Sequence, residues 1–400
     1  MEAVPVYPAI DPPDILLYGP GPSIVHPRIY RAMMAPVVGH LDPAFLAIMN
    51  ETSDMLRRVF GTDNRVTFPV SGTGSAGMEA ALVNVIEPGD PVVIGVNGVF
   101  GERMCSIVER SGGTLHRVDA PWGRILPPDQ IIEAMKQSGA KVVAVVHAET
   151  STGVAQPLEA IGQAAAESGA IFVVDCVTSL SGMPVNVDQR QIDVAYSGTQ
   201  KCLNAPPAMA PITFSEKALA KVRNRTTPVQ SWYLDVTMIE QYWGKERTYH
   251  HTAPITSVYA LHEALRIVLE EGLEKRFERH HRNAQAMAQA MAAFGLELLV
   301  PEEERLWTLV TPQVPEGVDE AAIRSHLREW FNIEIAGGLG PLKGKIWRIG
   351  LMGEGSQARN LETLLGAFGH VLRQAGWEVD PGAGVSALNR FYRERYSRPH

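Results

Sequence analysis

The feature that most constrains the fold is a series of short apolar runs that alternate with helical patterns between residues 43 and 271. Several runs lack the period-2 alternation of a half-buried strand, which indicates strands covered on both faces. The expected strands are residues 66–70, 92–96, 115–118, 142–147, 171–175, 192–196 and 210–213. Helices are expected between them, for example at residues 76–86 and 158–168. This alternation predicts a doubly wound, mainly parallel α/β domain, in which the carboxyl ends of the strands meet at one ligand-binding edge.

A different pattern begins after residue 271, with a long helix expected at residues 273–293. Short strands near residues 297–300, 306–311 and 346–349 and helices at 320–330 and 358–375 are expected to follow. We therefore expect an N-terminal arm of residues 1–13, a large domain of residues 14–271 and a smaller C-terminal α/β domain of residues 272–400.

Composition excludes several classes of protein. The 400 residues are 45% hydrophobic and 20% charged, enough for two domains with full cores, and the net charge of −8 predicts no binding to nucleic acid. No apolar run approaches the ~18 residues needed to span a membrane, and the N-terminus does not resemble a signal peptide. The three cysteines, Cys105, Cys176 and Cys202, have no metal-ligand spacing. We expect no metal and a reducing compartment, the cytoplasm.

A glycine-rich turn joins the first expected strand to its helix. It reads Ser71-Gly72-Thr73-Gly74-Ser75-Ala76-Gly77, formally the dinucleotide pattern G-x-G-x-x-G. The acidic residue that would bind a ribose is missing, because the next strand ends in Asn97. A P-loop is excluded because no lysine follows the glycines. The turn instead suits a single phosphate, bound by backbone N–H groups and by the hydroxyls of Thr73 and Ser75; a tight turn without an anion remains the alternative.

Two chemically complementary residues end strands of the same expected sheet. Asp175 closes the run 171–174, and Lys201 follows the next strand, 201 − 175 = 26 residues later. An amine can form a Schiff base with the aldehyde of pyridoxal phosphate (PLP), and a carboxylate can keep the pyridine nitrogen protonated. Taken alone, the aspartate could equally be a helix cap and the lysine a solvated surface residue.

In this order and spacing, the phosphate turn, Asp175 and Lys201 resemble the class V, fold-type I PLP aminotransferases, most closely the alanine–glyoxylate and serine–pyruvate branch. The resemblance extends from Gly19 to Gly353. Its most specific stretches are residues 79–85, 151–154, 197–201, 249–252 and 335–340. It implies the fold-type I architecture of a large PLP-binding domain and a small C-terminal domain.

The resemblance also implies the cofactor site. Lys201 is then the Schiff-base lysine and Asp175 the partner of the pyridine nitrogen. The phosphate ligands of the same chain would be Thr73, Gly74, Ser75 and Gln200. Tyr249 and Thr252 would be phosphate ligands donated by the neighbouring subunit of a homodimer with shared active sites.

Three further positions follow from the same resemblance. Thr150 stands where the family usually has a serine that bonds the ring oxygen. Phe100 stands where some members stack a tryptophan on the ring, so a smaller ring would stack here. Arg348 matches the arginine that binds the substrate carboxylate, a role that suits a bidentate guanidinium; without the resemblance, a surface salt bridge would be the preferred interpretation.

The expected activity is transamination between a small amino acid, alanine or serine, and glyoxylate or another small 2-oxo acid. The Pro/Gly segment around Gly21 is expected to line the pocket and to leave little room for a large substrate side chain. Gln200 stands where the related cysteine desulfurases have a histidine, and no cysteine follows Cys202 to act as their nucleophile. Ureidoglycine–glyoxylate and pyridoxamine–pyruvate transamination stay open, and a catalytically silent PLP-binding module is a remote alternative.

Overall fold

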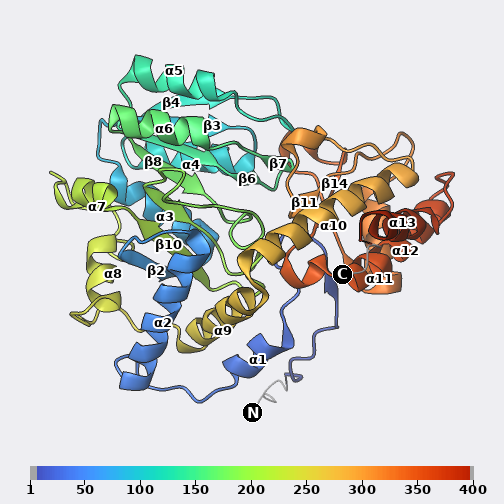
Figure 1. Ribbon diagram of the computed structural model, residues 1–400, viewed down its shortest axis with the longest axis horizontal. Helices are drawn as coiled ribbons and strands as arrows, with labels where there is room; N and C mark the ends of the chain where they lie inside the picture. The colour runs from blue at the N-terminus through green and yellow to red at the C-terminus, as the bar shows by residue number, and fades with distance from the viewer. Residues whose placement is uncertain (1–6, 397–400) are drawn as a thin grey trace, which may run out of the picture.

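A seven-stranded sheet forms the centre of the larger part of the protein, which is seen in a computed structural model that describes residues 7–396 (Figure 1). The strand order is β2-β10-β9-β8-β5-β3-β4. The strands are β2 (Val66–Ser71), β3 (Pro91–Val96), β4 (Thr114–Asp119), β5 (Val142–Val146), β8 (Ile171–Asp175), β9 (Val194–Tyr196) and β10 (Met209–Phe214). Only β10 runs antiparallel to its neighbours in this sheet. The seven predicted strands and the mainly parallel sheet are confirmed.

The helices follow the strands and cover the sheet. Helices α3 (Gly74–Val85) and α4 (Val99–Arg110) pack on each other and on the strands, as do α5 (Pro128–Ser138) and α6 (Glu159–Ser168). Every residue of β5 and β8 is buried, which explains why these runs are apolar without alternation. The remaining helices of this part are α1 (Pro27–Met33), α2 (Pro43–Phe60), α7 (Glu216–Arg223), α8 (Val236–Trp243) and α9 (Ile255–Glu271).

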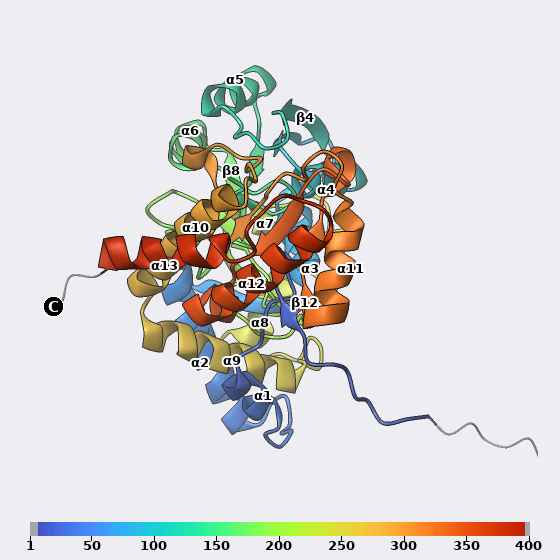
Figure 2. The same cartoon turned by 90° about the vertical axis from the view of Figure 1, so that its right-hand side faces the viewer.

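A smaller part with its own apolar core is formed by the C-terminal third of the chain (Figures 1 and 2). It contains a three-stranded antiparallel sheet of β11 (Leu309–Val310), β14 (Trp347–Gly350) and β13 (Ala336–Gly337). Its helices are α10 (Leu273–Ala293), α11 (Glu320–Phe331), α12 (Ala358–Gln374) and α13 (Ala383–Tyr396). The predicted helices 273–293, 320–330 and 358–375 are confirmed, whereas α13 was not predicted.

The strand predicted near residues 297–300 is wrong. This segment forms only an isolated bridge between Leu298 and Pro312 and two flanking backbone hydrogen bonds. Pro312 has no N–H to donate, so a regular ladder cannot continue through it. The strand predicted at residues 306–311 is confirmed only for Leu309–Val310.

The segment around residues 16–18 packs with the smaller, C-terminal part of the protein. Strand β1 (Leu16–Leu17) pairs in parallel with β12 (Ile333–Glu334), and the Tyr18 ring is fully buried in the C-terminal core. The boundary predicted between the larger and the smaller part falls at Gly272, between α9 and α10. The arm of residues 1–13 remains a prediction; residues 1–6 lie outside the described residues. Among residues 7–396, none of the helices combines the length and apolar character needed to cross a membrane.

Candidate active site

A cavity of ≈ 260 Å³ opens at the carboxyl edge of the large sheet. Seven of the residues singled out from the sequence line it, namely Gly74, Ser75, Phe100, Thr150, Asp175, Gln200 and Lys201. They lie at the carboxyl ends of five strands, at the starts of α3 and α4, at the end of β8 and in the segments that follow β5 and β9. Parallel pairing brings the ends of β3, β5, β8 and β9 to one edge of the sheet. The remaining lining residues are Met78, Arg103, Val146, Ala148, Val177 and Thr178.

Asp175 ends β8 and lies opposite Tyr196 of β9 in the parallel register. Its two carboxylate oxygens accept hydrogen bonds from the Val177 N–H at 2.8 Å and the Tyr196 hydroxyl at 2.9 Å. Burial raises the pKa of Asp175 to about 7, and these two hydrogen bonds act in the opposite direction. The carboxylate is therefore held in one orientation, in surroundings where a nearby cation would strongly favour its charged form.

Lys201 lies in the turn after β9 and reaches the same cavity. Its Nζ donates a hydrogen bond to the Pro20 carbonyl oxygen. The pKa of Lys201 is lowered to about 8, mainly by burial and also by the positive charge of Arg348, whereas Asp175 acts in the opposite direction. An amine with this pKa is substantially uncharged just above neutral pH, as a nucleophile or general base requires.

Gly21 lies next to the Lys201 side chain. Its φ is +111°, and a Cβ placed on it would lie 2.6 Å from the Lys201 Nζ. The positive φ favours glycine at this position, and a larger residue would also have to displace the Lys201 side chain. Residues 18–22 are not among those that line the cavity, so the expectation that the Pro/Gly segment restricts the pocket stays a prediction.

The phosphate loop keeps free donors at the start of α3. Thr73 is the N-cap residue but its side chain makes no capping hydrogen bond, and the first N–H groups of a helix have no partner inside it. The carboxamide oxygen of Gln200, on the facing loop, is buried without a hydrogen-bond partner among the described residues. Unpaired polar groups on both sides of a cavity point to an absent polar ligand. Thr73 itself is exposed and does not line the cavity.

Phe100 is placed by a carboxylate that sequence reasoning missed. The Phe100 N–H donates to Glu149 Oε2 at 3.2 Å, and the Val99 N–H donates to Ser151 Oγ at 3.0 Å, so α4 is capped by residues of another loop. The Ser151 hydroxyl also donates to Glu149 Oε1 at 2.6 Å. Burial raises the pKa of Glu149 despite these bonds. A Glu immediately before Thr150, shortly after the apolar run 142–146, was the available signal in the sequence.

Arg348 lies on β14 just behind the cavity rather than in its lining. The side chain is almost completely buried and donates to the Gly337 carbonyl oxygen at 2.7 Å and to the Thr150 carbonyl oxygen at 3.3 Å. Burial lowers its pKa. Its charge nevertheless affects Lys201, so the small C-terminal part contributes a cation to the site.

Tyr249 and Thr252 do not join the cavity of their own chain. Both are exposed, on the segment between α8 and α9, and the Tyr249 hydroxyl lies 3.4 Å from the Thr252 hydroxyl. Their predicted role in the site of a neighbouring subunit stays a prediction.

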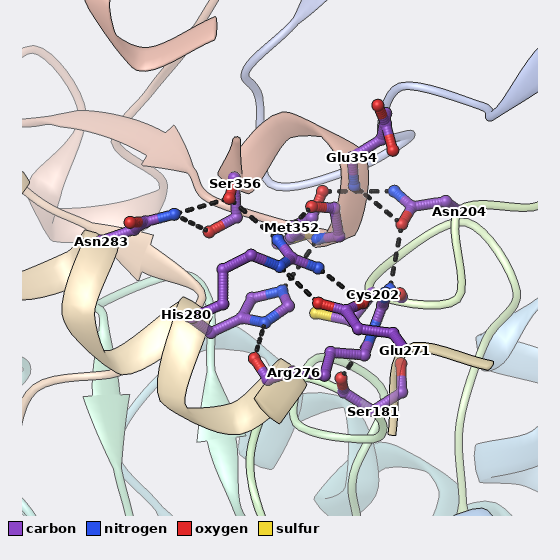
Figure 3. A network of polar contacts seen from close by, with 12 residues as sticks. Ser181, Cys202, Asn204, Glu271, Arg276, His280, Asn283, Met352, Glu354 and Ser356 are labelled. Atoms are coloured by element: carbon purple, nitrogen blue, oxygen red, sulfur yellow. Dashed lines mark hydrogen bonds and ion pairs between the residues drawn. The ribbon is translucent and has the colours of Figure 1, made fainter. Parts of the chain in front are cut away.

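A buried polar network supports the loop that carries Lys201 (Figure 3). From α10, Arg276 donates to the Cys202 carbonyl oxygen at 2.5 Å and to the Glu271 carboxylate at 2.6 Å. The Asn204 carboxamide donates to the Met352 carbonyl oxygen at 3.2 Å. The network therefore links the Lys201 loop to the segment that leaves β14, the strand of Arg348.

Two more residues of the site were missed from the sequence. Tyr196 could have been found, because it ends β9 directly opposite Asp175. Arg103, on the exposed side of α4, carries no periodic signal. Within the described residues, no group of three His, Cys, Asp or Glu side chains is arranged to hold a metal ion.

The arrangement resembles proteins of one family over nearly its whole length. The family model described as "Aminotransferase class-V" matches residues 28–343. The alanine–glyoxylate aminotransferase of Rattus norvegicus is 39% identical over 365 residues, which cover 90% of this chain and 88% of that protein.

Solved structures agree with this similarity. A ureidoglycine–glyoxylate aminotransferase from Bacillus subtilis is 43% identical, with a TM-score of 0.94 and coverage of 96% of this chain and 99% of the other. A pyridoxamine–pyruvate aminotransferase from Mesorhizobium loti is 28% identical, with a TM-score of 0.91 and coverage of 97% and 99%.

Proposed function

The chain belongs to the class-V aminotransferases, and from this premise we propose that it transfers an amino group, with PLP, between alanine or serine and glyoxylate or another small 2-oxo acid. The observation that carries the proposal is the meeting of Asp175, Lys201 and the α3 phosphate loop around one cavity. The family uses PLP. We further propose a cytoplasmic homodimer with shared active sites.

The residues of the cavity fit PLP on chemical grounds. The free N–H groups of the α3 turn and the carboxamide N–H donors of Gln200 suit a phosphate, and the buried Asp175 carboxylate suits a protonated ring nitrogen. The Phe100 ring offers an apolar face, and the Thr150 hydroxyl a polar contact. The Lys201 amine supplies the group that reacts with an aldehyde.

The roles of the side chains follow from this fit. PLP supplies an electron sink that accepts the electrons left on the substrate Cα when its proton is removed. Lys201, once displaced by the substrate amine, takes that proton at Nζ and returns it at the neighbouring carbon, so one residue acts as base and then as acid. Asp175 stabilises the positive charge of the ring nitrogen, and Tyr196 and Val177 hold its oxygens in place.

Arg348 is proposed to bind the carboxylate that donor and acceptor share. A guanidinium can hold a carboxylate through two parallel hydrogen bonds, and its terminal nitrogens keep donors beyond the contact with Thr150. A side chain at position 21 would meet the Lys201 amine, and we take this restricted space beside the reacting amine as support for a substrate with a small side chain.

A second candidate is ureidoglycine–glyoxylate transamination, which the 43% identity to the Bacillus subtilis structure favours. Pyridoxamine–pyruvate transamination has weaker support, at 28% identity. All of these reactions need the same lysine and aspartate, so they differ in donor and acceptor rather than in the proposed machinery.

A spectroscopic titration tests the proposal. The visible absorbance band of the lysine-bound cofactor is expected to bleach on adding the correct donor and to return on adding glyoxylate. Donors to compare are alanine, serine, ureidoglycine and pyridoxamine. Bleaching by alanine or serine supports the main proposal, and bleaching by ureidoglycine or pyridoxamine alone would replace it. A band that no donor bleaches would identify a silent binding module. The Lys201→Ala variant, which should lack the band, is the control.

A further inference from the structure

We propose that Arg103 is an additional phosphate ligand, which supplies the positive charge that the α3 loop lacks. This inference rests on the proposed use of PLP and names a residue to which the family resemblance assigned no role. Arg103 lies on α4, one helical turn after Phe100, and lines the same cavity.

The geometry places the Arg103 guanidinium between the phosphate loop and the Phe100 ring. Its Nη1 donates a hydrogen bond to the Ser75 hydroxyl at 3.0 Å, and its Cζ lies 5.1 Å from the centroid of the Phe100 ring. Ser75 belongs to the first turn of α3, where unpaired N–H groups point outward. One side chain thus spans the two features expected to contact the phosphate end and the ring of the cofactor.

Charge balance gives a reason for a cation at this point. A phosphate monoester carries a charge of about −1.5 to −2 near neutral pH, whereas a helix N-terminus is equivalent to only about +0.5. Thr73, Ser75 and Gln200 are neutral. Of the described residues that line the cavity, only Arg103 and Lys201 are cationic, and the proposed reaction uses the Lys201 amine for the aldehyde.

Arg103 also has unused binding capacity. In the described part of the chain it forms no ion pair, and the Ser75 hydroxyl is its one hydrogen-bond acceptor. Arg117, nearby in the fold, is by contrast paired with Asp119 and Glu102. A guanidinium has five N–H donors in a planar fork that matches phosphate oxygens, so most of these donors remain for a ligand.

The test compares two ligands that differ only in the phosphate. Apoprotein of the wild type and of Arg103→Gln is titrated with PLP and with pyridoxal, which has the same ring and aldehyde. PLP is expected to bind about 10-fold more weakly to the variant, a modest loss for a charge-assisted contact because the site is partly open to solvent. The affinity for pyridoxal is expected to change less than about twofold. Inorganic phosphate should compete with PLP less effectively in the variant.

Two variants serve as controls. Arg103→Lys keeps the charge and should recover part of the PLP affinity. Arg110→Gln removes an exposed arginine from the end of the same helix and should leave both affinities unchanged.

Other results would overturn the inference. Equal losses for PLP and pyridoxal would assign Arg103 to the placement of the Phe100 ring, and no loss for either ligand would exclude a role in binding. If wild-type protein bound PLP no better than pyridoxal, the proposed function itself would fail. That outcome differs from the other two because it appears without any substitution.

Discussion

At the scale of single residues, the Asp175 carboxylate is the group whose charge matters most to the proposed reaction. Asp175→Asn keeps the shape and removes the charge, so proton removal from the substrate should slow by about a thousandfold, equivalent to ~4 kcal/mol. Affinity for PLP should change far less, because the phosphate contacts remain. Single-turnover absorbance measurements give the rate, and equilibrium titration gives the affinity.

The matched control for this prediction is Asp119→Asn. Asp119 ends β4 at the same edge of the sheet but is exposed and outside the cavity lining. It should leave the rate unchanged. An Asp175→Asn rate within a few-fold of wild type would mean that Asp175 only anchors the loop.

The lowered pKa of Lys201 predicts a pH dependence for cofactor capture. Only the uncharged amine attacks the aldehyde, so the rate at which apoprotein captures PLP should rise with pH, with its midpoint near pH 8. Arg348→Gln removes a positive charge that lowers this pKa, so the midpoint should move to higher pH. Stopped-flow absorbance across the pH range measures both midpoints, with the exposed Arg359→Gln as control. Identical midpoints in wild type and Arg348→Gln would show that the two charges do not interact.

The site residues that could be predicted from the sequence are those that lie at or near the end of a strand. Asp175 ends its strand, and Gly74 and Lys201 lie within a few residues of the end of theirs, so sheet topology brings the three together. Arg103 could not be found in this way, because its position depends on the rotation of α4 against α3. The contact of Gly21 with Lys201 joins segments that no local pattern relates.

At the scale of elements, helix α10 holds the loop that carries Lys201 through hydrogen bonds from the Arg276 side chain. This guanidinium is buried and also donates to the Ser181 carbonyl oxygen at 3.0 Å. Burial alone would raise the pKa of its partner Glu271, but Arg279 and Arg276 outweigh that effect and lower it to about 2. Arg276→Met would leave buried carbonyl oxygens unpaired, so the free energy of unfolding should fall by ~3–5 kcal/mol.

Equilibrium denaturation with urea measures this loss. The control is Arg266→Met on α9, whose side chain is half exposed in its ion pairs with Glu263 and Glu270; the change there should stay within ~1 kcal/mol. If both variants lost the same small amount, the Arg276 network would have no special part in stability.

Apolar runs predicted the strands of the large sheet because both faces of those strands are covered. The small sheet was harder, since its strands have only two to four residues and a proline interrupts the segment beside β11. Helix α13 carries polar residues on much of its surface, so its sequence gives no clear start or end.

At the scale of the whole molecule, the expected dimer makes a prediction about mixed subunits. Inactive Lys201→Ala subunits and inactive subunits with Tyr249→Ala and Thr252→Ala should regain activity on mixing, because one site of each heterodimer would combine native Lys201 with native Tyr249 and Thr252. Random exchange would restore up to about a quarter of wild-type activity. Steady-state assays after subunit exchange measure the recovery, and mass spectrometry verifies the heterodimers.

A triple variant with all three substitutions, mixed with Lys201→Ala subunits, is the control that should remain inactive. If verified heterodimers recovered no activity, Tyr249 and Thr252 would act within their own subunit and not in the active site of the neighbouring one.

The pairing of β1 with β12 also bears on the order in which a new chain can be completed. Because synthesis proceeds from the amino end, Leu16 cannot pair with Ile333 until all strands of the large sheet have been synthesised. Pro20 and Gly21, which contact Lys201, are held in place just beyond this pairing. A nascent chain that has not reached β12 therefore lacks the β-pairing that holds Pro20 next to the Lys201 amine.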